Sequence, residues 1–259
     1  MRGRRSYAGV WLAVALVVVA HLCQSFWSGA YVGDAQLVTY PQHVLVLTAH
    51  PDDECMFFAP TIHALRAHGV QVSALCLSQG NADGLGHLRA SELVRSYEVL
   101  GVPAKDVACI DDPRLQDGMQ QKWSPAAVRD VVKAHMAHSD VDTILTFDAG
   151  GVSLHPNHQA LFHGAELLQH ELAATQARAV TLWTLHTNSW RIKFGGALVS
   201  LLQRTEPRDY LFRSSLRAYV QSLRAMYQHQ TQLVWFRYLY VLTSSYMFAN
   251  RVRILVQAL

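Results

Sequence analysis

Residues 48–54 carry the sequence TAHPDDE, and this stretch decides the fold class predicted for the chain. The run before it, residues 43–48 (HVLVLT), is short, apolar and β-branched, which is typical of a buried strand. After it, residues 56–68 place apolar side chains at helical spacing and stop before Gly69, which predicts a helix. An imidazole and three carboxylates therefore occupy a strand-to-helix turn at the carboxyl edge of a sheet, where open α/β sheets bind their ligands.

A second segment with the same layout lies about a hundred residues downstream, at residues 147–158 (FDAGGVSLHPNH). Residues 142–147 predict a strand, a glycine-rich turn follows, and a helix is predicted from His158 to residue 170. Two such strand ends can meet at neighbouring positions of a parallel sheet. An imidazole and a carboxylate from the first turn, with an imidazole from the second, would form a three-ligand site with an open position, as in catalytic zinc sites. The remaining carboxylate could then act as a base on metal-bound water.

Each motif also has a purely structural interpretation. The acidic run before a helix could serve only for N-capping and for matching the helix dipole. The histidines three residues apart could belong to a solvated helix face, in a chain that contains 14 histidines. The occurrence of both motifs at two strand ends favours the metal site.

The two motifs resemble those of the PIG-L/LmbE family of zinc-dependent N-acetylglucosamine deacetylases. The family signatures AHPDDE and H-x-x-H stand here at residues 49–54 and 155–158. The segment TFDAGGV at residues 146–152 is similar to sequences of the eukaryotic branch of this family, which acts on N-acetylglucosaminyl-phosphatidylinositol. The resemblance extends over residues 43–250, and it implies a Rossmann-like α/β fold.

The resemblance also implies a role for individual residues. The implied zinc ligands are His50, Asp53 and His158. Fe²⁺ or Co²⁺ would suit the same ligands. Asp52 would be the general base, and His155 would stabilise the developing oxyanion or protonate the leaving amine. Bacterial relatives carry a tyrosine where this chain has Ser153, so the role of that tyrosine cannot be transferred.

A third segment, residues 78–86 (SQGNADGLG), lies between a predicted strand at residues 72–77 and a predicted helix. Glycine-rich loops at helix N-termini bind anions. The family pattern G-x-x-R-x-x-E matches Gly86, Arg89 and Glu92, and the resemblance implies that Arg89 binds substrate. The structural alternative is an ion pair between Arg89 and Glu92 on one helix.

Composition agrees with a single α/β core. The chain has 259 residues, of which 51% are hydrophobic. Strands and helices alternate from residue 43 to residue 185, which predicts a mostly parallel sheet with helices on both faces. The net charge of +3 is too small and too diffuse for a nucleic-acid-binding protein, so that class is excluded. The four cysteines lack paired spacing, which argues against a disulfide framework or a cysteine-rich zinc site.

The sequence predicts three regions. Residues 1–30 are predicted to be a membrane anchor, because residues 7–27 are apolar and long enough to form a transmembrane helix; a cleaved signal peptide is the alternative. Residues 40–212 would form the α/β deacetylase domain. Residues 213–259 are aromatic and basic, and would pack on this domain or on a membrane surface.

The resemblance implies an endoplasmic reticulum membrane protein with its catalytic domain on the cytosolic face, although the N-terminal arginines favour the opposite orientation. The implied activity is hydrolysis of the N-acetyl group of N-acetylglucosaminyl-phosphatidylinositol to glucosaminyl-phosphatidylinositol and acetate, an early step of GPI-anchor biosynthesis. Two alternatives remain. One is a deacetylase of a soluble GlcNAc conjugate, and the other is a non-catalytic module that binds sugar or lipid.

Overall fold

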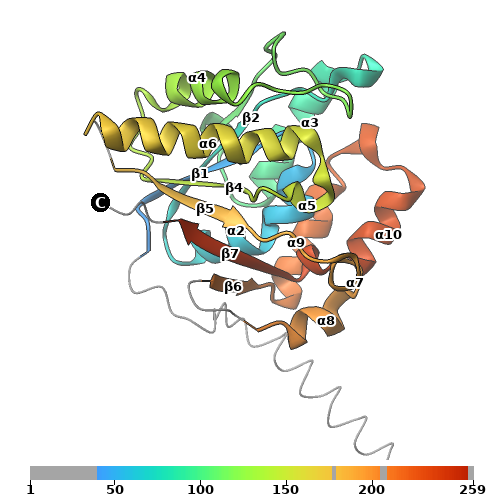
Figure 1. The fold of residues 1–259 in the computed structure, drawn as a ribbon. Helices are drawn as coiled ribbons and strands as arrows, with labels where there is room; N and C mark the ends of the chain where they lie inside the picture. The colour runs from blue at the N-terminus through green and yellow to red at the C-terminus, as the bar shows by residue number, and fades with distance from the viewer. Residues whose placement is uncertain (1–39, 177–178, 205–208, 256–259) are drawn as a thin grey trace, which may run out of the picture.

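The computed structural model describes residues 40–176, 179–204 and 209–255, and it contains a seven-stranded sheet with the order β3-β2-β1-β4-β5-β7-β6 (Figure 1). Five strands run parallel to one another: β1 (His43–Thr48), β2 (Gln71–Cys76), β3 (Val107–Cys109), β4 (Thr143–Phe147) and β5 (Thr181–Leu185). The last two are antiparallel to their neighbours: β6 (Asp209–Arg213) and β7 (Ala249–Leu255).

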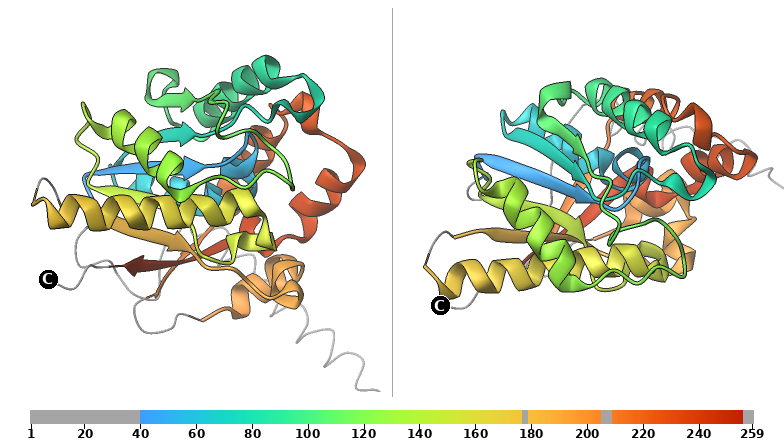
Figure 2. Two further views of the ribbon diagram at one scale, coloured as in Figure 1. Left: turned by 45° about the horizontal axis from the view of Figure 1, so that its top comes forward. Right: turned by 90° about the horizontal axis from the view of Figure 1, so that it is seen from above.

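Helices cover both faces of this sheet, so the predicted α/β fold with a mostly parallel sheet is confirmed. One face carries α4 (Pro125–Met136) and α6 (Pro156–Ala174), which lie side by side (Figure 2). The other face carries α2 (Ala59–Ala67), α3 (Gly86–Val99) and α9 (Leu216–Met226). The remaining helices are α5 (Gly151–Leu154), α7 (Trp190–Lys193), α8 (Gly196–Leu202) and α10 (Trp235–Thr243).

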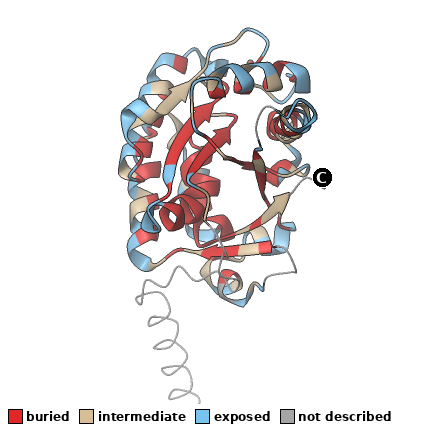
Figure 3. Ribbon diagram, turned by 90° about the vertical axis from the view of Figure 1, so that its left-hand side faces the viewer, coloured by how far each residue is buried: buried red, intermediate tan, exposed pale blue. Residues whose placement is uncertain are grey.

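The central strands form the core: their residues are mostly buried (Figure 3), and most of the buried side chains are apolar. All six residues of β1 are buried between β2 and β4, with Thr48 opposite Cys76 and Val46 opposite Leu145. Continuous apolar strands of this kind are typical of parallel sheets covered on both faces. The two helices on one face approach closely at Gly164, where a Cβ atom would meet Val128 Cγ1 at 2.3 Å.

The strand order reverses at β1. The chain proceeds from β1 to β2 and β3 on one side, and then crosses to β4 and β5 on the other. Connections diverge from the carboxyl ends of β1 and β4, which opens a crevice at this edge of the sheet. Both sequence motifs lie there, at the topological switch point where open α/β sheets bind ligands.

The helix predicted at residues 56–68 has a different start. A π-helical turn, η1 (Glu54–Phe58), precedes α2, and the helix ends before Gly69, whose φ is +75°. Pro60 lies in the first turn of α2, where its missing N–H needs no partner. Irregular turns of this type are frequent at functional sites.

The predicted location in the endoplasmic reticulum membrane is corrected by the structure. Across residues 40–176, 179–204 and 209–255, no helix has both the length and the apolar character needed to cross a bilayer. The transmembrane helix proposed for residues 1–30 lies outside the described residues.

Candidate active site and metal centre

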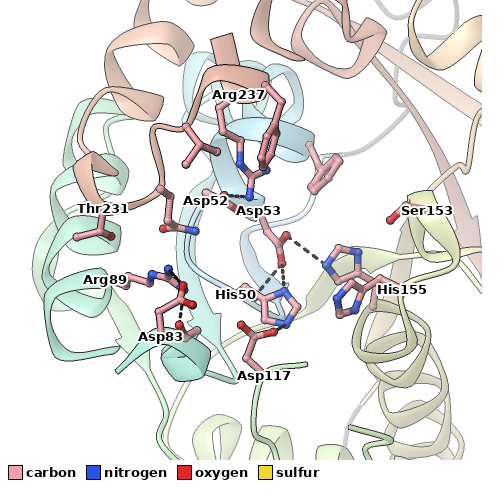
Figure 4. A pocket seen from close by; sticks show the side chains of 16 residues that line it. His50, Asp52, Asp53, Asp83, Arg89, Asp117, Ser153, His155, Thr231 and Arg237 are labelled. Carbon is pink, nitrogen blue, oxygen red and sulfur yellow. Dashed lines mark hydrogen bonds and ion pairs between the residues drawn. The ribbon is translucent and has the colours of Figure 1, made fainter. Parts of the chain in front are cut away.

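The first turn separates two adjacent carboxylates. Asp52 has a φ of +96°, which few non-glycine residues adopt and which often marks a functional turn. The turn is held by Asp53, whose Oδ2 accepts hydrogen bonds from the backbone N–H groups of Ala49 (3.0 Å) and His50 (2.9 Å). As a result, Asp53 faces the histidines while Asp52 faces Arg237 (Figure 4).

The second turn fixes the tautomer of His158. Its Nδ1 lies 3.1 Å from the carbonyl oxygen of Gly151. A carbonyl can only accept, so Nδ1 carries the proton and Nε2 of the neutral ring keeps its lone pair. The ring stacks on Phe147, the last residue of β4, with centroids 4.0 Å apart. His158 is therefore held with a lone pair directed at the first turn.

Three of the predicted residues could hold a metal. Nε2 of His158 lies 3.2 Å from Oδ1 of Asp53, and Nδ1 of His50 lies 3.9 Å from Oδ2 of the same carboxylate. Ligand atoms of the three residues all lie within 4.8 Å of one another. A lone pair facing a carboxylate oxygen is unfavourable unless a cation lies between them or the ring is protonated. Two imidazoles and one carboxylate are the donor set of catalytic zinc, so the residues fit a divalent metal.

The ionisation of Asp53 supports this assignment. Burial alone would raise the pKa of this carboxyl group, but the positive charge that His158 and His50 carry when protonated outweighs burial and lowers the pKa well below its usual range; a bound divalent cation would act in the same direction. Metal ligands must be deprotonated, and Asp53 meets this requirement.

Asp52 has the opposite character. Burial raises its pKa to about 6, although the charge of Arg237 counteracts the rise. The Nη2 atom of Arg237 lies 2.6 Å from Oδ2 of Asp52. A carboxyl group that titrates near neutral pH is suited to general base chemistry.

His155 presents a proton to the same space. Its Nδ1 accepts a hydrogen bond from the backbone N–H of Asn157 at 3.3 Å, so the neutral ring carries its proton on Nε2. Burial lowers the pKa of His155 to about 4, and the positive charge that His158 and His50 carry when protonated acts in the same direction. The ring centroid lies 4.8 Å from that of His158. His155 is therefore a neutral donor at pH 7.

Arg89 lies on the opposite wall. Its guanidinium group donates to the carbonyl oxygen of Gly80 and to Oδ2 of Asp83. The alternative pairing with Glu92 is not formed, because Glu92 instead accepts hydrogen bonds from the backbone N–H (2.9 Å) and the hydroxyl group (2.6 Å) of Thr231.

A single pocket of about 430 Å³ brings together all six predicted site residues. They are His50, Asp52, Asp53, Arg89, His155 and His158. Ser153 also lines this pocket. The roles of the six residues stay predictions, but their convergence follows from the strand order.

Two further pocket residues were missed by the sequence analysis. Asp117, in the long loop between β3 and α4, has Oδ1 3.0 Å from Nε2 of His50, and this contact lowers the pKa of the carboxyl group. With His155 these two residues form a second group that could hold a metal. Arg237 comes from α10, where it is the one charged residue in an otherwise largely apolar helix.

A short segment, residues 229–232, holds the C-terminal region on the catalytic turn; we name it the C-terminal clamp. His229 Nε2 lies 2.6 Å from Oε1 of Glu54, and both side chains are completely buried. The side-chain amide of Gln232 donates to the carbonyl oxygen of Pro51 at 2.7 Å. These contacts position the start of α10 and thereby place Arg237 over Asp52.

Comparisons with known proteins agree with these motifs. The family model described as PIG-L, GlcNAc-PI de-N-acetylase, matches residues 45–168. The chain is 36% identical over 245 residues to the probable N-acetylglucosaminyl-phosphatidylinositol de-N-acetylase of Schizosaccharomyces pombe, which covers 93% of this chain and 97% of that protein. It is 38% identical over 211 residues to the Bos taurus N-acetylglucosaminyl-phosphatidylinositol de-N-acetylase, which covers 82% of this chain and 83% of that protein.

The fold is also found in a solved structure. The N,N'-diacetylchitobiose deacetylase of Pyrococcus horikoshii superposes with a TM-score of 0.59 at 16% identity, covering 98% of this chain and 95% of that one. At this identity the likeness concerns the fold alone. The similarity to the eukaryotic relatives spans most of the chain at more than 30% identity, so the chain belongs to the PIG-L family.

Proposed function

We propose that this protein hydrolyses the N-acetyl group of N-acetylglucosaminyl-phosphatidylinositol, giving glucosaminyl-phosphatidylinositol and acetate, an early step of GPI-anchor biosynthesis. The eukaryotic relatives that bear this name align with most of the chain. The observation that carries the chemistry is the separation of Asp52 from Asp53 in one pocket: one carboxylate faces two imidazoles, and the other stays outside that group.

His50, Asp53 and His158 would hold the metal, and zinc suits this donor set. When bound, zinc polarises a carbonyl group and lowers the pKa of water to about 7. The carbonyl of Gly151 orients His158, and the backbone N–H groups of Ala49 and His50 orient Asp53. Such supporting contacts fix ligand geometry before the metal arrives.

The remaining residues would carry the proton transfers. Asp52 takes a proton from the water molecule whose oxygen attacks the acetyl carbon. His155 directs its Nε2–H toward the acetyl oxygen as negative charge develops there. When the C–N bond breaks, the proton held by Asp52 passes to the leaving nitrogen, which leaves an amine and acetate. Arg89, on the opposite wall of the pocket, would bind the sugar or the phosphate group of the substrate.

The test is deacetylation of N-acetylglucosaminyl-phosphatidylinositol by the purified protein, before and after chelation and with zinc added back. We expect activity to disappear with the metal and to return with it. Cleavage of a soluble GlcNAc conjugate, without turnover of the lipid, would show that the proposed substrate is wrong.

Two variants separate the roles of the adjacent carboxylates. Asp52→Asn should abolish turnover and keep stoichiometric zinc, because the base is lost and the ligands remain. Asp53→Asn should lose zinc and activity together. Loss of zinc from Asp52→Asn, with zinc retained by Asp53→Asn, would show that the two roles have been exchanged.

A further inference from the structure

Three helices expose an apolar surface beside the pocket. We name this surface the apolar face; its main side chains are Trp190, Phe194, Leu202, Trp235, Leu239 and Leu242. Trp190 and Trp235 are 72% and 74% exposed. Isolated exposed apolar residues are ordinary, but a group of them on neighbouring helices is typical of an interaction site.

The helices that carry these side chains, α7, α8 and α10, contact one another and lie together at one edge of the molecule (Figure 1). The ring of Phe194, which follows α7, lies 6.5 Å from that of Tyr240 in α10. At the start of α8, a Cβ atom on Gly196 would lie 3.5 Å from the carbonyl oxygen of Leu242. Segments about 40 residues apart in the chain therefore build one surface.

The charged residues around the apolar face indicate which kind of partner it could bind. The sequence contains no Asp or Glu at residues 187–205 or at residues 210–259, while basic residues recur in both segments. The Arg191 guanidinium group lies 5.6 Å from the ring centroid of Trp190, and the Lys193 ammonium group lies 5.5 Å from that of Phe194. Exposed aromatic side chains flanked by cations suit the headgroup region of a bilayer with anionic lipids. A second copy of the chain would instead oppose like charges.

The same helix connects this face to the pocket. Val234, Phe236 and Arg237 line the pocket, and Arg237 contacts Asp52. Trp235, next to these residues in the chain, is exposed and is not part of the pocket lining. The pocket and the apolar face therefore share the N-terminal turn of α10.

We propose that the face formed by α7, α8 and α10 rests on the surface of an anionic lipid bilayer, as a peripheral contact. This inference rests on the proposed function and extends it. A lipid-linked sugar could enter the pocket at the N-terminal turn of α10 while its acyl chains remain in the bilayer. The contact concerns a surface of the folded domain and requires no membrane-spanning helix.

The test uses the full chain and vesicles of phosphatidylcholine and phosphatidylinositol, in which the phosphatidylcholine carries a photoactivatable diazirine on its acyl chain. Labelled peptides are then identified by mass spectrometry. We expect labels within residues 190–202 and 234–242. The double variant Trp190→Asp with Trp235→Asp should reduce this labelling by about tenfold or more, because two large apolar contacts are replaced by charges that anionic lipid repels.

Leu167→Asp, a single apolar-to-acidic change at an exposed position of α6, is the control and should leave the labelling unchanged. Labels confined to residues outside the apolar face would overturn the proposal. So would a dimer in solution that the double variant converts to a monomer, with no labelling of the face, because the face would then be an interface between copies.

A parallel assay separates this inference from the proposed function. Turnover is measured with N-acetylglucosaminyl-phosphatidylinositol in the same vesicles and with its deacylated, water-soluble headgroup. The double variant should lose turnover in vesicles by about tenfold and keep it on the soluble headgroup. Labelling of the face without turnover of either substrate would overturn the proposed function alone. Turnover by the wild type without labelling would overturn the lipid contact alone.

Discussion

Replacing His229 by alanine tests whether one buried pair holds the C-terminal clamp on the catalytic turn. Nε2 of His229 lies 2.6 Å from Oε1 of Glu54, and neither side chain is exposed to solvent. Burial alone would lower the pKa of this imidazole, but the charge of Glu54 and the hydrogen bond to it, together with the charges of Asp52 and Glu92, outweigh burial and raise the pKa. The raised pKa favours the protonated imidazole, which makes a charged interaction with Glu54.

The expected cost follows from what the substitution leaves behind. Removing one partner of a buried ion pair costs about 3–5 kcal/mol, because the other charge stays buried without compensation. Glu54 would keep hydrogen bonds from the Ser96 hydroxyl group and the Asp52 backbone N–H. These donors place the cost at the lower end of the range, at about 3 kcal/mol. In a domain of this size the melting temperature should fall by roughly 6–12 °C.

Thermal unfolding followed by circular dichroism measures this shift. The matched control is His163→Ala, because His163 and Glu166 form the same kind of pair at 3.8 Å on an exposed helix surface. The control should cost less than about 1 kcal/mol. Adding Glu54→Gln to His229→Ala should recover part of the loss, since a neutral amide needs no counter-charge. Equal melting temperatures for His229→Ala and the control would refute the reasoning.

Three other substitutions give separate readouts. Arg237→Gln should lower kcat by roughly tenfold with zinc content unchanged, because Asp52 loses the partner that orients it; loss of zinc would assign Arg237 a structural role instead. Arg89→Gln should raise KM by roughly tenfold with little change in kcat, and an unchanged KM would remove Arg89 from substrate binding. His63 is buried, and burial lowers its pKa to about 4, whereas its unfolded pKa is about 6.5. Since the unfolded chain takes up this proton first, stability should fall as pH decreases from 6.5 toward 4, by about 2 kcal/mol at pH 5. Urea unfolding of His63→Gln should lack this contribution, and parallel pH profiles for variant and wild type would contradict it.

The predictable parts of the fold are those that depend on the spacing of apolar and polar residues within a short segment. The strand, turn and helix around residues 43–67 follow from an apolar run, a polar turn and helical spacing. The antiparallel pair β6 and β7 was not predicted, because Arg251 and Arg253 interrupt the apolar pattern of β7. Both arginines pair with Asp209 of β6, and this contact becomes visible only once the two strands are adjacent.

In the site, too, local features could be predicted from the sequence and contacts between distant residues could not. Adjacent residues in a turn point in different directions, so different environments for Asp52 and Asp53 could be expected from the sequence. The ion pair between Asp52 and Arg237 joins residues far apart in the chain, and no spacing rule connects them. Asp117 reaches His50 from the loop between β3 and α4, which has no regular structure, so no periodic pattern in the sequence connects the two residues.

The C-terminal clamp has a consequence for how the protein is made. The residues that could hold the metal have all been synthesised once residue 158 has been added, but the contacts to Glu54 and Asp52 come from residues 229 and 237. A chain that has grown past residue 158 but not yet to residue 229, or one cut short by a premature stop codon between these positions, contains all three candidate metal ligands and lacks the partner of Asp52. The complete site, with Arg237 beside Asp52, can therefore form only late in synthesis, after almost the whole polypeptide has been made.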